Sequence, residues 1–174
     1  DMDQLNAFRK HSLNPEHPHV RGTTASSETF FQGREAGNGH YDAIPDIVQH
    51  YMDEINKLTG RNYKLFDYYG APDAEEVVVV MGSGAETARE TVDYLMSQGR
   101  KVGMISVHLF RPFSAKHFLS VLPETVRKVA VLDRTKESGS VGEPLYLDVK
   151  AVLTGSGRSF DAIVGGRFGL AAKD

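Results

Sequence analysis

The chain has 174 residues, of which 40% are hydrophobic and 25% charged, and its formal net charge at pH 7 is -3. This length and composition suit one globular domain, or one domain with a substantial appendage. The slightly acidic balance predicts neither nucleic-acid binding nor attraction to an anionic membrane, and no apolar run approaches the ~20 residues of a membrane-spanning helix. The absence of cysteine excludes disulfides and thiolate ligation of zinc or an iron–sulfur cluster.

The first part of the chain, residues 1–74, is predicted to be an irregular N-terminal extension or linker. Residues 12–42 are rich in glycine, proline, serine, threonine and asparagine, a composition typical of loop. A loop of this length is uncommon inside a compact domain, so we expect a connection that wraps over another surface.

One helix is well signalled within this extension, over residues 45–59. Pro45 suits the first turn, Asp46 favours its positive end, and Gly60 is a natural stop. Apolar side chains recur at helical spacing at Ile44, Ile47, Val48, Tyr51, Ile55 and Leu58.

From Glu75 onward the sequence alternates regularly between strand and helix patterns. Strands are predicted within residues 75–84, 101–113, 128–135 and 160–169, and helices within 85–99, 114–125 and 143–153. This alternation is the signature of an α/β domain with a largely parallel sheet. The strands are apolar almost throughout, as in sheets covered on both faces. Residues 75–174 are therefore predicted to form a mostly parallel open sheet with helices on both faces.

Four segments are expected to meet where the predicted parallel strands end. They are residues 82–84, 109–112, 133–136 and 165–167. Ligands of open α/β sheets usually bind outside this carboxyl edge of the sheet. The sequence therefore directs the search for functional residues to these four loops.

The turn Gly82-Ser83-Gly84 has two interpretations. It could bind an anion, although it lacks the lysine of a P-loop and the full GxGxxG pattern. It also fits a capping box, in which Ser83 bonds a free backbone N–H group and Glu86 reaches back. Capping is the favoured interpretation, and Ser83 and Gly84 remain weak candidates for cofactor binding.

The charged run after the third predicted strand also has two interpretations. Asp133 could act as a general base while Arg134 and Lys136 hold a phosphate. Alternatively, Asp133 caps the loop and the two cations pair with a neighbouring surface, which is the commoner fate of such clusters. The second interpretation is favoured. Arg111 is the other arginine of interest, since Pro112 forces an extended turn directly after a strand.

No metal site or catalytic constellation is predicted from the residues. His17 and His19 form the only close histidine pair, but Pro18 argues against a helix there and no third ligand follows nearby. His108 and His117 are expected to be packing or surface residues. No Ser/His/Asp order and no paired-carboxylate spacing stands out, so no catalytic residue is assigned.

Several segments in conserved order nevertheless resemble one enzyme family. They are LNPEHPHVRGT (13–23), FFQGREA (30–36), YKLFDYYGAPDAEEVVVVMGS (63–83), VHLFRPFSAKHF (107–118), VLDRTKE (131–137), GEPLYLDV (142–149) and VGGRFGL (164–170). Together they resemble the second domain of pyruvate:ferredoxin (or flavodoxin) oxidoreductase, preceded by the tail of the first domain. That domain is similar to the C-terminal domain of transketolase. The match departs at Ser138, where proline is usual in the family.

The resemblance implies a piece of an enzyme that acts on 2-oxoacids. The whole enzyme oxidises pyruvate with coenzyme A to acetyl-CoA and reduces ferredoxin or flavodoxin. It uses thiamine diphosphate, magnesium and iron–sulfur clusters, and it is expected to be a cytoplasmic homodimer. The family's cofactor motifs have no counterpart in this chain. We therefore expect a structural domain with no catalytic residue, metal or cofactor of its own and no turnover when isolated.

In that setting the charged loops are expected to contact other domains of the same polypeptide. The candidates for salt-linked interdomain contacts are Arg111, Asp133, Arg134, Lys136 and Arg167, while Phe30 and Phe31 would lie over a neighbouring domain. The alternative function is a module that binds a small anion or coenzyme A. Its contacts would be Ser83, Gly84, Arg134 and Lys136.

Overall fold

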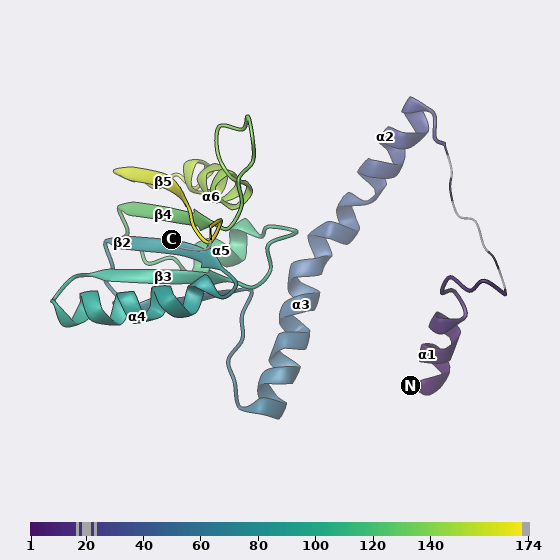
Figure 1. Cartoon of the computed structure of the whole chain (residues 1–174), viewed down its shortest axis with the longest axis horizontal. Coiled ribbons are helices and arrows are strands. Elements are labelled where there is room, and N and C mark those ends of the chain that lie inside the picture. The colour runs from purple at the N-terminus through teal and green to yellow at the C-terminus, as the bar shows by residue number, and fades with distance from the viewer. Residues whose placement is uncertain (17, 19–21, 23, 172–174) are drawn as a thin grey trace. The chain divides into compact units, whose positions relative to one another are not determined.

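The computed structural model describes residues 1–16, 18, 22 and 24–171 (Figure 1). The chain divides into two units, Asp1–Asn38 and Gly39–Asp174. Within the described ranges, no helix combines the length and the apolar character that crossing a membrane requires.

The first unit contains the helices α1 (Met2–Arg9) and α2 (Ser27–Ala36), neither of which buries a side chain. Ser26 caps the start of α2, and its Oγ accepts a hydrogen bond from the Thr29 N–H group at 3.4 Å. The prediction that residues 12–42 are loop throughout was therefore wrong. A helix without a buried face lacks apolar periodicity, which is the main sequence signal for a helix.

The helix predicted over residues 45–59 is confirmed, but α3 is longer and spans Asn38–Thr59. Pro45 lies inside the helix, not in its first turn. Val48 and Met52 pack against the core of the second unit. The sequence missed the first turns because their residues contribute little to the apolar stripe.

Side chains of α3 form hydrogen bonds with the backbone just before the first strand of the sheet. Asn56 Oδ1 accepts a hydrogen bond from the Tyr63 N–H group at 2.7 Å, and Asn56 Nδ2 donates to the Tyr63 carbonyl at 2.9 Å. Gln49 Oε1 accepts from the Leu65 N–H group at 3.2 Å. These bonds fix the approach to the first strand.

The second unit is built on a five-stranded sheet with the order β1-β3-β2-β4-β5. Its strands are β1 (Phe66–Gly70), β2 (Glu76–Met81), β3 (Val102–Val107), β4 (Lys128–Asp133) and β5 (Ala162–Arg167). β2, β3, β4 and β5 are mutually parallel, which confirms the predicted mostly parallel sheet, and β1 adds to β3 as an antiparallel edge. The sheet thus begins before Glu75, the residue at which the α/β domain was expected to start.

Helices lie on both faces of this sheet, as predicted (Figure 1). One face, here the closed face, packs against α5 (Ala115–Val121), α6 (Pro144–Gly155) and side chains of α3. The other, here the open face, carries α4 (Gly84–Ser97), which contacts β1, β3 and β2. The closed-face core is the larger and includes Phe66, Phe118, Ile105, Val131 and Leu145. The open-face core is centred on Val80, Val92, Val102 and Met104.

Candidate functional site

The four predicted loop segments follow or end the parallel strands and so share one edge of the sheet. The chain passes from β2 to β3 on one side and then crosses to β4 on the other side of β2. This reversal is the topological switch point, outside which open α/β sheets bind ligands. The structure therefore places Ser83 and Gly84, after β2, beside Arg134, after β4.

The turn after β2 does not form the predicted capping box. Ser83 precedes α4 with helical backbone angles, φ -62° and ψ -21°, and its side chain makes no capping hydrogen bond. A capping serine needs an extended backbone to aim its oxygen at the free N–H groups, and Gly82, with φ 75°, turns the chain one residue too early for that.

The start of α4 is covered by an aromatic ring. A Cβ atom built on Gly84 would lie 2.7 Å from two carbons of the Phe168 ring. The ring therefore packs beside Gly84. The N–H groups of Ala85 and Glu86, which an anion would need, already donate to the carbonyls of Gly82 at 3.0 Å and Ser83 at 3.4 Å. This arrangement does not suit the anion-binding interpretation of the turn.

Asp133 is buried and supports α6. The residue is 1% exposed, and its Oδ1 and Oδ2 accept hydrogen bonds from the N–H groups of Leu145 at 3.0 Å and Tyr146 at 3.1 Å. Burial raises the pKa of this carboxyl, and the two N–H donors oppose the shift. Both oxygens are thus committed to the first turn of α6, and this geometry provides no general base facing a ligand.

A second buried carboxylate, Glu143, organises the loop between β4 and α6. It accepts a hydrogen bond from the Glu137 N–H group at 2.6 Å and forms an ion pair with Arg167. The Glu137 N–H group, followed by Arg167, lowers the pKa of Glu143. Sequence reasoning missed Glu143, although its place directly before Pro144 marks the start of a helix.

The other cations that the sequence singles out differ in their partners and their exposure. Arg111 forms an ion pair with Asp148 of α6 and lies over the Phe110 ring, 4.2 Å from its centroid. Arg134 is exposed, and its Nε donates to the Gly169 carbonyl at 3.3 Å. Lys136 is exposed on the loop that follows.

The histidines show no metal-binding arrangement in the part of the chain that the structure describes. No group of three or more potential ligands gathers there. His108 Nε2 lies 3.1 Å from Asp67 Oδ2, and His117 Nδ1 lies 2.8 Å from Ser114 Oγ. The pair at residues 17 and 19 lies outside the described residues.

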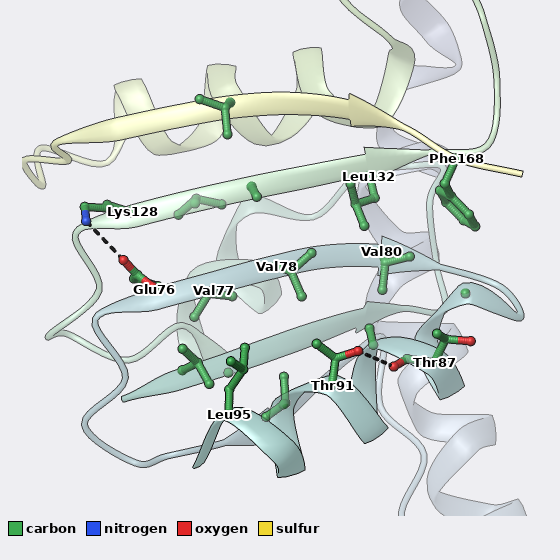
Figure 2. Close-up of a pocket in the computed structure, with 18 of the residues that line it drawn as sticks. Glu76, Val77, Val78, Val80, Thr87, Thr91, Leu95, Lys128, Leu132 and Phe168 are labelled. Atoms are coloured by element: carbon green, nitrogen blue, oxygen red, sulfur yellow. Dashed lines mark hydrogen bonds and ion pairs between the residues drawn. The ribbon is translucent and has the colours of Figure 1, made fainter. Parts of the chain in front are cut away.

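An apolar groove runs along the open face and was not predicted (Figure 2). Its volume is about 760 Å³, and Val78, Val80 and Leu132 project into it from the sheet. The wall is formed by residues of α4, including Thr87, Ala88, Thr91 and Leu95. At one end Lys128 Nζ lies 3.0 Å from Glu76 Oε1, and Ser83, Gly84, Arg134 and Phe168 lie at the other.

Comparison with a family profile gives one match. Residues 74–169 match the family described as "Pyruvate:ferredoxin oxidoreductase core domain II".

Curated relatives match along the whole chain or nearly so. Pyruvate:ferredoxin oxidoreductase of Moorella thermoacetica is 58% identical over 174 residues, which are 100% of this chain and 15% of that protein. Pyruvate-flavodoxin oxidoreductase of Rhodospirillum rubrum is 54% identical over 181 residues, covering 100% of this chain and 15% of that protein. Pyruvate dehydrogenase [NADP(+)] of Cryptosporidium parvum is 53% identical over 175 residues, covering 99% and 9%.

A solved structure shares the fold. A chain of 2-oxoglutarate:ferredoxin oxidoreductase from Magnetococcus marinus superimposes with a TM-score of 0.54 at 16% identity. The match covers 92% of this chain and 25% of the other. The chain described here thus spans a small share of each of these larger proteins.

Proposed function

Because this chain belongs to the pyruvate:ferredoxin oxidoreductase family, through its core domain II, we propose that it is a non-catalytic structural domain of a larger oxidoreductase. Its partners would be the other domains of the same polypeptide. The whole enzyme would oxidatively decarboxylate pyruvate with coenzyme A to acetyl-CoA and reduce ferredoxin or flavodoxin. We place this enzyme in the cytoplasm as a homodimer.

The observation that carries the proposal is the use of Asp133. This carboxylate stands at the switch point of the sheet, where a catalytic acid or base would be expected, yet both of its oxygens cap α6. Glu143 and Arg167 pair with each other nearby. These three buried or paired groups therefore stabilise a loop and a helix end.

The family's cofactors do not fit the residues of this chain. Without cysteine it cannot supply thiolates to an iron–sulfur cluster, and the described residues offer no group of metal ligands for magnesium. The first N–H groups of α4, which would suit a diphosphate, bond instead to the carbonyls of Gly82 and Ser83. We therefore assign thiamine diphosphate, magnesium and the iron–sulfur clusters to other parts of the whole enzyme.

The relatives also support a role remote from the electron acceptor. Proteins named for ferredoxin, flavodoxin and NADP(+) are 58%, 54% and 53% identical to this chain. A segment that selected the acceptor would be expected to diverge among enzymes that use different acceptors. The near-equal identities favour a scaffold that these enzymes share.

The test is an activity assay on the 174-residue chain. Supplied with pyruvate, coenzyme A, thiamine diphosphate, magnesium and a viologen dye, the chain is expected to reduce no dye, whereas the full-length Moorella thermoacetica enzyme serves as the positive control. Dye reduction by the chain alone would overturn the proposal.

Calorimetry separates the structural role from the alternative of coenzyme A binding. Titration with coenzyme A or thiamine diphosphate at millimolar concentration is expected to release no binding heat. If coenzyme A gives heat that Arg134→Ala abolishes, the binding-module alternative replaces the structural one.

A further inference from the structure

On the open face of the sheet, α4 leaves a strip over β4 and β5 uncovered, and this strip is two strands wide. α4 contacts β1, β3 and β2, whereas α6 packs on β4 and β5 from the closed face. Val164, in the middle of β5, is 54% exposed and lines the groove. Neighbouring strands are about 4.8 Å apart, so the strip over β4 and β5 is about as wide as one α-helix, whose diameter is ~10 Å.

The surface of this strip suits a helix packed beside α4. The floor is apolar, with Val78, Ala130, Leu132 and Val164 pointing from the sheet into the groove. The wall of α4 presents small side chains there, such as Ala88 and the threonines next to it. Small side chains allow two helices to approach within the usual 8–10 Å, and mostly parallel sheets are normally covered on both faces.

The charges at the two ends of the groove differ. At the amino ends of the strands, Glu76 and Lys128 pair with each other. At the carboxyl ends, Arg134 is exposed and forms no ion pair among the described residues. A carboxylate or the negative end of a helix dipole would complement Arg134.

We propose that this groove is the docking site for an amphipathic α-helix that lies outside residues 1–174 in the same oxidoreductase polypeptide. Its apolar face would lie on Val78, Leu132 and Val164, and its C-terminal end, the negative end of the helix dipole, would lie at Arg134. The inference rests on the proposed function, because the relatives place this segment within a much longer polypeptide, of which it is 15%. A polypeptide of that length has enough chain to contribute the covering helix itself.

The helices of this chain are poorer occupants. A six-residue strand such as β5 is about 20 Å long, which requires a helix of about 13 residues. α1 has 8 residues and α2 has 10. α3 of a second copy would be long enough, but its Val48 and Met52 already pack against the core of their own unit.

The test measures the protection of one introduced cysteine at a time. The 174-residue chain has no cysteine of its own, so each introduced cysteine lies in a peptide that mass spectrometry can distinguish in the full-length protein. Val164→Cys reports on the groove, and Val141→Cys, at a loop residue that is 94% exposed, is the matched control. Alkylation by iodoacetamide is followed by mass spectrometry of the peptide carrying each cysteine. In the 174-residue chain we expect the two to react within about threefold of each other, and in the full-length oxidoreductase we expect Val164→Cys to react at least tenfold more slowly. Equal reaction in the full-length protein overturns the proposal.

The occupant is identified by replacing Val164 with the photo-cross-linking residue p-benzoylphenylalanine in the full-length protein. The expected product joins position 164 to a helical segment outside residues 1–174 of the same polypeptide. A product with residues 1–38, or with residues 38–59 of a second copy, overturns it. Ala162→Cys repeats the protection measurement if the variants at position 164 fail to assemble.

The docking helix and the structural role can be disproved separately. If the groove is uncovered in the full-length enzyme and the isolated chain reduces no dye, the docking helix is disproved but the structural role is not. Dye reduction by the isolated segment removes the structural role itself.

Discussion

The two faces of the sheet are built by the same strands but are completed differently. On the closed face, Val79, Ile105 and Val131 are neighbours across three strands, and each is 0% exposed. On the open face, the corresponding layer passes from the buried Met104 beneath α4 to Val164, which is 54% exposed. The closed face can therefore carry the stability of the chain, while part of the open face remains available for a contact.

The charged residues at the carboxyl ends of the strands also differ in their contacts between the two faces. Asp133 and Arg167 occupy the closed-face positions of their strands, and both are engaged with the loop and helix packed there. Arg134 lines the groove on the open face and is held only by one hydrogen bond to the Gly169 carbonyl among the described residues. Asp133 and Arg134 are adjacent in the sequence but lie on opposite faces. Position in the sequence alone therefore does not distinguish a structural charge from one that is available to a partner.

The largest effect is expected at the aromatic cluster of the closed face. Phe118 is 0% exposed, and its ring centroid lies 5.5 Å from those of Phe66 and Phe113. Phe118→Ala should lower the free energy of unfolding by about 3–5 kcal/mol, because a buried ring is replaced by a cavity. Urea denaturation followed by circular dichroism measures this loss. The control Phe168→Ala, at the rim of the groove, should cost roughly half as much or less, and equal losses would contradict the difference between the faces.

An intermediate effect is expected for the carboxylate that caps α6. Asp133→Ala leaves the N–H groups of Leu145 and Tyr146 without their acceptor, which should lower the free energy of unfolding by about 1–3 kcal/mol. Asp148→Ala is the control, because it breaks only the ion pair with Arg111 at the surface and should cost at most about 1 kcal/mol. The same urea titration compares both variants. If Asp133→Ala proves neutral, the buried carboxylate is not a structural cap.

The order of strands and helices from Glu75 onward could be predicted because each element carries its own local signal. Pro144 starts α6, and Val77–Val80 form an apolar strand bounded by a glycine turn. β1 was missed because FDYYG is short and its pairing with β3 is a long-range choice that local patterns do not encode.

The site could be predicted only in part. The sequence brings the right loops to one edge of the sheet, because the parallel order fixes which strand ends meet. It does not tell that Asp133 points into the closed face, since that depends on the register of β4 against its neighbours. It also cannot reveal the groove, because an apolar strand indicates a covered face without indicating which polypeptide covers it.

The smallest change in the free energy of unfolding is expected at Val164, the exposed valine of the open face. Val164→Ala in the 174-residue chain should change the free energy of unfolding by no more than about 0.5 kcal/mol, since this side chain is half exposed and its removal leaves no closed cavity. Val79→Ala deletes the same two methyl groups from a site that is 0% exposed and should cost about 2–3 kcal/mol. Differential urea denaturation of the two variants gives the contrast directly.

The same pair of substitutions sharpens the comparison in the full-length oxidoreductase. If a docked helix covers the groove, Val164 becomes a buried residue there, and Val164→Ala should cost about 1–2 kcal/mol, seen as a lower unfolding midpoint of the assembled protein. Val79 is already buried in the segment, so its cost should change little between the two settings. A cost at Val164 that stays near zero in the full-length protein would mean that the open face is exposed there as well. The greater exposure of Val164 than of Val79 would then not be caused by the absence of a docked helix from the 174-residue chain.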